Sequence, residues 1–206
     1  MYVRPAHREE RLPVLHDAIE NIRFGTLITM GARSPIATHI PMFVNTQPAP
    51  LGTIFGHIAR QNTQWQQTVK EQNAVAAFVG PHAYISPSLY ETKILTGKVV
   101  PTWMYIAIQA SGPIEFFEDG ERLHAIVRES TRRQERARAT PWAVEDAPED
   151  YVQGQLRAIV GFELRIEQLD GAWKFAQKKT EGDRLGVADG LQAQDEQVSD
   201  LIRKHA

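Results

Sequence analysis

The stretch that decides the fold is Lys98-Val99-Val100-Pro101-Thr102-Trp103-Met104-Tyr105-Ile106-Ala107-Ile108. Its β-branched and aromatic residues predict a long strand, which a proline interrupts early. Proline cannot donate a ladder hydrogen bond, so the backbone beside it is freed from pairing. Pro101, Thr102 and Trp103 therefore have the composition of a pocket wall, with a directional hydroxyl next to an aromatic surface.

Segments on both sides of this stretch predict further strands separated by turns. Apolar and β-branched runs predict strands over 24–30, 36–44, 52–58, 74–79, 83–86, 114–117, 158–169 and 172–177. Turn signals lie at 80–82, 112–113 and 170–171, and the last of these predicts a hairpin. Because the strands do not alternate with helices as in a parallel sheet, we expect a mainly β (α+β) fold, a small antiparallel barrel with peripheral helices.

A few helices complete the predicted fold. Leu12, Leu15, Ile19 and Ile22 recur at spacings of three and four, which predicts a helix over residues 8–22. Further helices are expected over 121–136 and 146–156, and a helical tail at about 192–205 after a polar loop over 178–185. We expect residues 1–206 to form a single domain.

Composition bounds the class of protein. The chain has 206 residues, a net charge of −2 and 42% hydrophobic residues, enough for one substantial core. It has no cysteine, which excludes disulfides, cysteine-ligated metals and a cysteine nucleophile. The first residues lack the apolar core of a signal peptide, and no apolar run reaches the ~20 residues of a membrane helix. We therefore predict a cytoplasmic protein without a membrane partner.

Several common catalytic motifs are absent from the sequence. It contains no dinucleotide-binding glycine motif, P-loop, zinc-protease motif or nucleophile elbow. The seven histidines are scattered singly, so no metal site is predicted.

Two other segments offer polar groups to a ligand. Thr38, His39 and Pro41 lie in the second predicted strand, where a proline bulge would leave backbone groups free for a flat heterocycle. A structural histidine is the competing interpretation of His39. The segment 57–62 joins a strand to a helix for which Asn62 is the predicted N-cap, and it offers Arg60 and free amides to an anion. An ordinary capped turn with a solvated arginine is the alternative there, and Trp65 is expected in the core.

Two basic segments have functional and structural interpretations. The helix over 121–136 and the residues after it carry an arginine cluster that would contact DNA phosphates or form a solvated face: Arg128, Arg132, Arg133, Arg136 and Arg138. Gln177 and Lys178 begin a surface loop that would close over a phosphate or over the edge of a ligand held by a partner subunit.

Taken together, these pieces resemble the PaiB-type family, FMN-binding split β-barrel proteins whose members are named negative transcriptional regulators. The matching segments run through nearly the whole chain in order: 37–41, 57–65, 80–88, 98–105, 159–163, 173–178 and 183–191. At two places the chain differs from the family pattern. Met104 replaces an asparagine, and Ala176-Gln177-Lys178 replaces Ser-Gln-Asn. The Lys178 charge either compensates at the phosphate or flavin binding is weaker.

The resemblance implies a split barrel of the FMN-binding type, assembled as a homodimer with FMN at the subunit interface. Phosphate contacts would come from Arg60, Gln61 and Asn62, and the ring would lie against the second strand and the Pro101–Trp103 strand. The residues expected to bind the cofactor are Thr38, His39, Pro41, His57, Arg60, Gln61, Asn62, Trp65, Val100, Pro101, Thr102, Trp103, Gln177 and Lys178.

Three functions follow from the resemblance. The first is an FMN-binding protein, with FMN-dependent oxidoreductase activity open and its acid or base unassigned among His39, His57, Tyr84 and Tyr105. The second is a transcriptional regulator that acts through its basic surface or through partner proteins. The third is a haem-binding or haem-handling split-barrel protein with a lone histidine as axial ligand.

Overall fold

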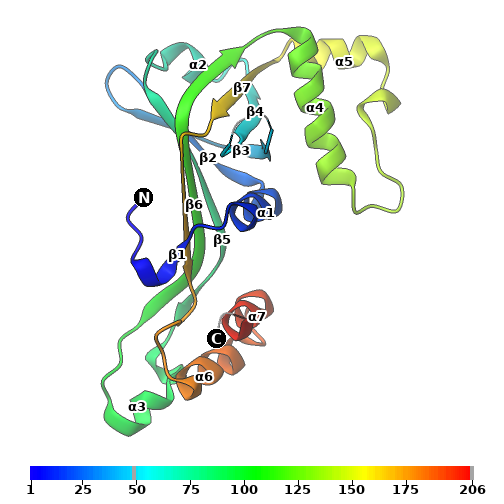
Figure 1. Ribbon diagram of the computed structural model, residues 1–206. Helices are drawn as coiled ribbons and strands as arrows, with labels where there is room; N and C mark the ends of the chain where they lie inside the picture. The colour runs from blue at the N-terminus through cyan, green and yellow to red at the C-terminus, as the bar shows by residue number, and fades with distance from the viewer. Residues whose placement is uncertain (48–49, 205–206) are drawn as a thin grey trace. The chain divides into compact units, whose positions relative to one another are not determined.

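The computed structural model describes residues 1–47 and 50–204. Within them, eight strands form an antiparallel sheet in the order β1-β8-β6-β5-β2-β3-β4-β7 (Figure 1). The strands are β1 (Arg8–Glu9), β2 (Phe24–Met30), β3 (Pro35–Asn45), β4 (Thr53–Ala59), β5 (Asn73–Ile85), β6 (Thr102–Phe117), β7 (Ile159–Arg165) and β8 (Gln168–Lys174). Because β7 also pairs with β6, six of the strands close into a ring, β6-β5-β2-β3-β4-β7. The predicted antiparallel barrel is confirmed.

The helices flank this sheet: α1 (Leu12–Ile22), α2 (Gln64–Gln67), α3 (Glu91–Thr96), α4 (Gly120–Glu135), α5 (Glu149–Leu156), α6 (Glu181–Leu191) and α7 (Glu196–Lys204). Short 3-10 turns lie at η1 (Pro5–His7), η2 (Pro87–Leu89) and η3 (Val144–Asp146). The chain divides into two compact units. Of the described residues, the first unit contains 1–15, 79–108 and 170–204, and the second contains 16–47, 50–78 and 109–169.

Pro41 marks the point at which β3 changes partners. β3 pairs with β2 from Pro35 to Pro41 and with β4 from Met42 to Asn45. The backbone N–H of Met42 donates instead to the carbonyl of Arg23 at 2.7 Å. A residue without an N–H is tolerated where the ladder passes from one neighbour to the next.

The two long strands run through positions where turns were predicted. Gly80-Pro81-His82 lies inside β5 and Gly112-Pro113 inside β6, so both predicted interruptions are wrong. Gly112 serves close packing, because a Cβ atom there would lie 1.9 Å from the carbonyl oxygen of Arg165. At its other end β6 begins at Thr102, directly after Pro101, so residues 98–101 of the predicted strand lie outside β6.

The predicted hairpin at 170–171 is also wrong, since Asp170 and Gly171 lie within β8. β7 pairs with β4 and β6, whereas β8 pairs with β1 through Arg8 opposite Ala172. This pairing takes Arg8 and Glu9 out of the predicted helix 8–22, and α1 starts at Leu12. The Glu9 carboxylate accepts a hydrogen bond from the Arg11 backbone N–H at 2.9 Å just before the helix.

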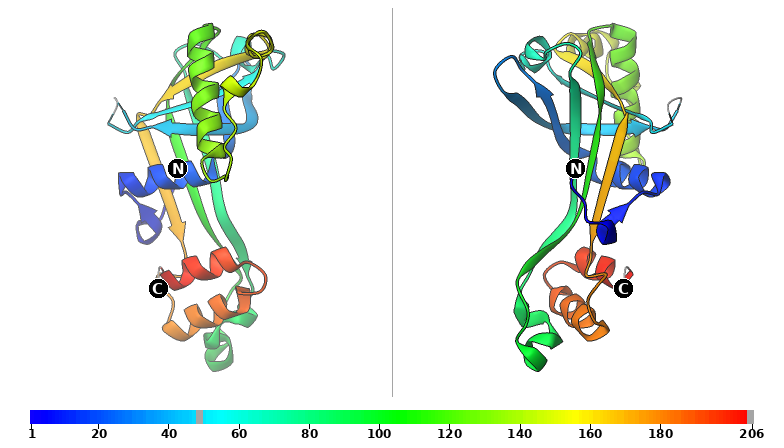
Figure 2. Two further views of the ribbon diagram at one scale, coloured as in Figure 1. Left: turned by 90° about the vertical axis from the view of Figure 1, so that its right-hand side faces the viewer. Right: turned by 60° about the vertical axis from the view of Figure 1, so that its left-hand side comes forward.

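Each unit has buried apolar packing of its own. In the second unit, α4 and α5 bury Leu123, Ile126, Val152 and Leu156 in one cluster with Phe43 and Phe117. In the first unit, α6 and α7 lie side by side (Figure 2), and the Ser199 hydroxyl of α7 donates to the Ala188 carbonyl at 2.8 Å. Among the described residues, no helix is long and apolar enough to cross a membrane.

The C-terminal region is more helical than predicted. α6 replaces part of the expected loop 178–185, because the Thr180 hydroxyl caps it by accepting from the Asp183 backbone N–H. Asp183 is buried and accepts 2.8 and 3.0 Å hydrogen bonds from the backbone N–H and hydroxyl of Thr92, at the start of α3. The predicted tail of 192–205 becomes α7 at Glu196–Lys204, and residue 205 lies outside the described residues.

Candidate functional site

Two predicted site residues of the second unit, Thr38 and Asn62, meet in a hydrogen-bond network around Gln64, which sequence reasoning missed. The Thr38 hydroxyl donates to the Gln64 side-chain oxygen at 2.6 Å, and the Asn62 amide donates to the Thr38 hydroxyl at 2.9 Å. Gln64 is 1% exposed, and its amide also donates to the Thr29 hydroxyl at 3.0 Å. The buried amide therefore fixes two predicted residues from different elements in one orientation.

The other predicted residues on β3 and β4 differ in exposure. His39 and Pro41 are exposed, and the His39 imidazole shares a 2.9 Å hydrogen bond with the Thr26 hydroxyl. His57 is half-buried on β4 opposite Gly161. Burial lowers the pKa of His57, so its imidazole is neutral at pH 7.

Arg60 is held by the protein itself. Its guanidinium donates to the Arg157 carbonyl at 2.6 Å and the Ile159 carbonyl at 3.3 Å, and it forms an ion pair with Glu118. The half-buried Trp65 indole donates to the Arg60 carbonyl at 3.2 Å. A phosphate at Arg60 would compete with these partners, so of the three predicted phosphate ligands the exposed Gln61 is the most available.

The short helix after this segment has a different cap from the predicted one. α2 contains four residues and its N-cap is Thr63, although the Asn62 side chain accepts from the Gln64 backbone N–H at 3.0 Å. Asn62 thus lies one residue before the N-cap, which corrects its predicted role, and it stays within the Gln64 network.

The predicted residues of the first unit include an exposed aromatic cluster. Trp103 is 52% exposed, and its ring centroid lies 5.9 Å from that of His82 and 6.0 Å from that of Tyr84. We name these three residues the Trp103 cluster. Met104 alternates with Trp103 along β6 and is buried, so it contributes nothing to this exposed surface.

Four other predicted residues line a cavity of about 320 Å³ in the first unit: Val100, Thr102, Gln177 and Lys178. We name it the basic pocket. The structure adds residues that sequence reasoning did not select: Arg4, His7, Tyr90, Met104, Lys174, Ala176 and Lys179. The β1–β8 pairing explains why Arg4 and His7 were missed, because it brings the N-terminal residues to β8 without any local sequence signal.

Hydrogen bonds fix the pocket wall. The Lys174 ammonium donates to the Thr102 hydroxyl at 2.8 Å. The Gln177 amide donates to the Trp173 carbonyl at 2.5 Å, while its oxygen lies 3.0 Å from the His7 imidazole nitrogen. The Lys179 ammonium lies 4.2 Å from the centre of the Tyr90 ring. Most of the polar lining is therefore oriented by the protein.

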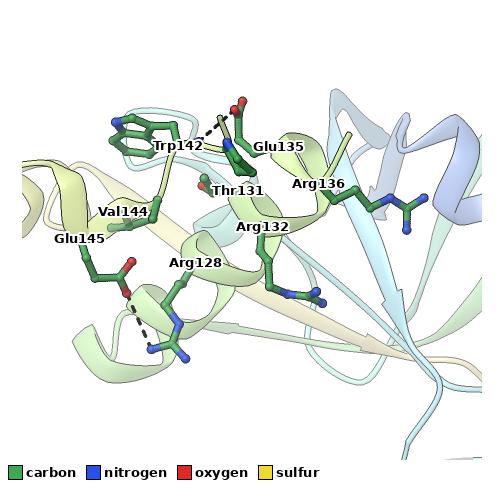
Figure 3. A pocket seen from close by; sticks show the side chains of 10 residues that line it. Arg128, Thr131, Arg132, Glu135, Arg136, Trp142, Val144 and Glu145 are labelled. Atoms are coloured by element: carbon green, nitrogen blue, oxygen red, sulfur yellow. Dashed lines mark hydrogen bonds and ion pairs between the residues drawn. The ribbon is translucent and has the colours of Figure 1, made fainter. Parts of the chain in front are cut away.

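The arginine-rich helix α4 borders a separate groove of about 440 Å³ in the second unit (Figure 3). Arg128 lies 3.8 Å from Glu145, Arg132 lies 2.7 Å from Glu129, and Arg138 lies 3.0 Å from Glu135. In Figure 3, Arg132 and Arg136 point away from Trp142, so the groove does not focus their charge on one point.

Arg133, which was also predicted as a DNA contact, is mostly buried. It pairs with Glu20 and with Glu129 and donates to the Val44 carbonyl at 3.0 Å. These contacts do not favour phosphate binding by α4, and the DNA-binding alternative stays a prediction.

The closed antiparallel ring defines a split-β-barrel protein, and comparison with solved structures agrees. The FAD and heme binding protein from Mycobacterium smegmatis superposes with a TM-score of 0.59 over 82% of this chain and 73% of that one, at 13% identity. The chain belongs to the family described as "Putative FMN-binding domain", whose model matches residues 1–168. This membership supports flavin mononucleotide as the cofactor, as predicted.

Two relatives match over most of their length. An uncharacterised protein of Aspergillus fumigatus is 34% identical, with 93% of this chain and 91% of that protein aligned. Protease synthase and sporulation protein PAI 2 of Bacillus subtilis is 29% identical, with 93% and 89% aligned. The predicted PaiB-type resemblance is confirmed.

The donor set of the chain fits a flavin nucleotide. Trp103 offers an exposed aromatic face for a flat heterocycle, and the basic pocket offers positive charge to an anionic group. Among the described residues, no group of three histidine, aspartate or glutamate side chains is placed to hold a metal ion.

Proposed function

We propose that the protein binds FMN at the interface of a homodimer, with the isoalloxazine ring against the Trp103 cluster. The exposure of Trp103 carries this proposal. A tryptophan that is 52% exposed between two other rings leaves a large aromatic surface in water, and covering that surface is favourable. A flat flavin ring, together with the surface of a second subunit, would cover it.

The remaining predicted residues supply polar contacts in this proposal. The Thr102 hydroxyl and the Gln177 amide orient ligand atoms in the first unit. The Thr38 and Asn62 groups of the second unit, held by Gln64, stay predicted contacts. Bound FMN would supply electron transfer, while the chain orients the ring and excludes water from it. A neutral His57 is able to accept a proton, and its role as a base is part of the proposal.

A visible spectrum of the purified protein, followed by FMN titration of flavin-free protein, tests cofactor binding. We expect flavin absorbance and an FMN-dependent rise in melting temperature. Trp103→Ala should raise the FMN Kd by roughly tenfold, because stacking on an aromatic ring contributes about 1–3 kcal/mol. Trp142→Ala is the matched control, since Trp142 is 48% exposed and lies in the α4 groove. A wild-type protein without FMN binding, or equal Kd values in both variants, would reject the proposal.

The homodimer needs its own measurement. Light scattering coupled to gel filtration should give twice the mass of one chain for the wild type. Tyr84→Ala removes one ring of the Trp103 cluster and should shift the protein towards monomer at low concentration. A monomeric wild type that still binds FMN would overturn the interface and leave the cofactor assignment standing.

A further inference from the structure

The basic pocket contains more positive charge than its own surroundings neutralise. Arg4, Lys174, Lys178 and Lys179 all line this cavity of about 320 Å³, and its lining includes no carboxylate. None of the four forms an ion pair with a carboxylate in the part of the chain that the structure describes. Four cations around one cavity repel each other, so an anion placed there is favoured.

The effect of this crowding is visible at Lys174. Among the described residues, the partners of its ammonium are the Thr102 hydroxyl at 2.8 Å and the Tyr105 ring at 5.6 Å. Burial lowers the pKa of Lys174, and the charge of Arg4 lowers it further. The charged lysine is therefore held where neither water nor a counter-ion fully stabilises it.

Tyr90 provides an independent observation in the same cavity. It is 2% exposed, and its hydroxyl is buried without a hydrogen-bond partner among the described residues. Burial and the charge of Asp183 raise the pKa of Tyr90, so the phenol stays protonated and able to donate. A buried donor without an acceptor is costly, and a ligand oxygen in the pocket would satisfy it.

We propose that the basic pocket is a binding site for a phosphate monoester. A phosphate monoester carries a charge of about −1.5 to −2 at pH 7 and three acceptor oxygens. Those oxygens match the available donors, which are the lysine ammonium groups, the Arg4 guanidinium and the Tyr90 hydroxyl. A carboxylate has one charge and would leave most of the cations unneutralised.

This inference rests on the proposed function and deepens it, because Thr102 and Gln177 line the basic pocket and are also proposed to contact the flavin. The pocket lies within the first unit, and its lining leaves out Arg60, Gln61 and Asn62, to which the family resemblance assigns the FMN phosphate. Two sources of the phosphate group have the same chemistry: FMN itself and a separate phosphorylated substrate. The experiment has to distinguish them.

Binding of inorganic phosphate to flavin-free protein is the direct test. At pH 7.5 and constant ionic strength, adding the protein should broaden the ³¹P resonance of phosphate. Phosphate should also raise the melting temperature of the protein more than chloride does. Lys174→Met combined with Lys179→Met should raise the phosphate Kd by tenfold or more, because each lysine removed takes away a charge-assisted hydrogen bond to phosphate. Lys204→Met is the control, as it removes an exposed lysine at the end of α7.

Tyr90→Phe keeps the test decisive if the double variant fails to fold. Removing an unpartnered buried hydroxyl should leave the melting temperature of the ligand-free protein unchanged or higher. The same change should raise the phosphate Kd several-fold, which a purely structural role of Tyr90 would not do. Wild-type protein that prefers phosphate no more than chloride, or variants that bind phosphate as tightly as wild type, would overturn the proposal.

Comparing the binding of FMN with that of riboflavin, which lacks the phosphate, identifies the source of the phosphate group. If the FMN phosphate occupies the pocket, the double variant loses affinity for FMN but not for riboflavin, and FMN-loaded protein no longer binds inorganic phosphate. If a separate substrate occupies it, FMN affinity is unchanged and FMN-loaded protein still binds phosphate. Both results support the phosphate site, and failure of all flavin binding with intact phosphate binding would reject only the flavin proposal.

Discussion

The helix α4 and the basic pocket are both rich in cations, but only one of them has lost its charge to carboxylates. On α4, Glu129 lies within 2.7 Å of Arg132 and 2.5 Å of Arg133, and Glu20 also pairs with Arg133. In the basic pocket, Lys174 and Lys179 face a hydroxyl and an aromatic ring instead. In the sequence the helix stands out as a cluster of cations because its arginines are close together along the chain, and it was predicted to contact DNA phosphates or to form a solvated face. In the structure the pocket has the more available charge, because its cations have no carboxylate partner among the described residues.

The difference in carboxylate pairing also separates cations that stabilise the fold from cations that are available to bind a ligand. A cation paired with a partly buried carboxylate stabilises the fold, and removing it leaves the carboxylate without a partner. A cation among other cations contributes little to the fold and is available to a ligand. Substitutions in the two regions should therefore have different effects on the free energy of unfolding.

The largest expected effect is at Arg133. Its side chain is 18% exposed, pairs with a Glu20 side chain that is 19% exposed, and lies 4.6 Å above the Phe43 ring. Arg133→Met should lower the free energy of unfolding by about 2 to 3 kcal/mol, since Glu20 and the Val44 carbonyl lose a donor. Urea denaturation followed by circular dichroism measures it.

The control for that variant is Arg132→Met, because Arg132 pairs with the same Glu129 but has a side chain that is 68% exposed. An exposed pair contributes about 0.5 kcal/mol, so this variant should denature close to wild type. Equal losses in the two variants would mean that Arg133 is not held as the structure shows.

A smaller effect is expected from acid titration of Glu129. The two arginine partners, chiefly Arg132, lower the pKa of Glu129 to about 2. A carboxyl with a lowered folded-state pKa stabilises the protein above its ordinary pKa of 4.5, and that stability is lost as pH falls towards 2. Glu129→Gln should therefore be less stable than wild type by about 1 to 2 kcal/mol at pH 6, and the difference should vanish near pH 2. Denaturation midpoints measured from pH 6 to pH 2 test this, and a constant difference would contradict it.

Local sequence patterns predicted strands and helices well where the residues of the segment itself determine its structure. The strand over 24–30 and the helix over 121–136 agree with β2 and α4 within one residue. Predictions at 80–82 and 112–113 were wrong because both segments lie inside long strands, where Gly112 serves close packing. The Arg165 carbonyl beside Gly112 comes from a residue far along the chain, so no local pattern indicates it.

The candidate site was predicted in part for the same reason. Thr102, Gln177 and Lys178 line the basic pocket as a group, and Thr38 and Asn62 share one network, although the sequence did not show their grouping. Arg4 and His7 reach the pocket through the β1–β8 pairing, which no pattern near residue 4 predicts. Carboxylate partners are likewise invisible in the sequence, since Glu20 and Arg133 are 113 positions apart.

The smallest expected effect is at Lys174, and it is the sharpest test of the comparison. Lys174→Met loses a hydrogen bond to Thr102 but also removes a partly buried cation near Arg4, so the two changes oppose each other. Without phosphate we expect the free energy of unfolding to stay within about 0.5 kcal/mol of wild type. Raising NaCl from 0.01 to 1 M shortens the Debye length from about 30 to about 3 Å, which should stabilise wild type more than the variant. A loss of about 2 kcal/mol instead would make Lys174 a structural cation like Arg133, and the pocket would lose the surplus charge on which its phosphate site depends.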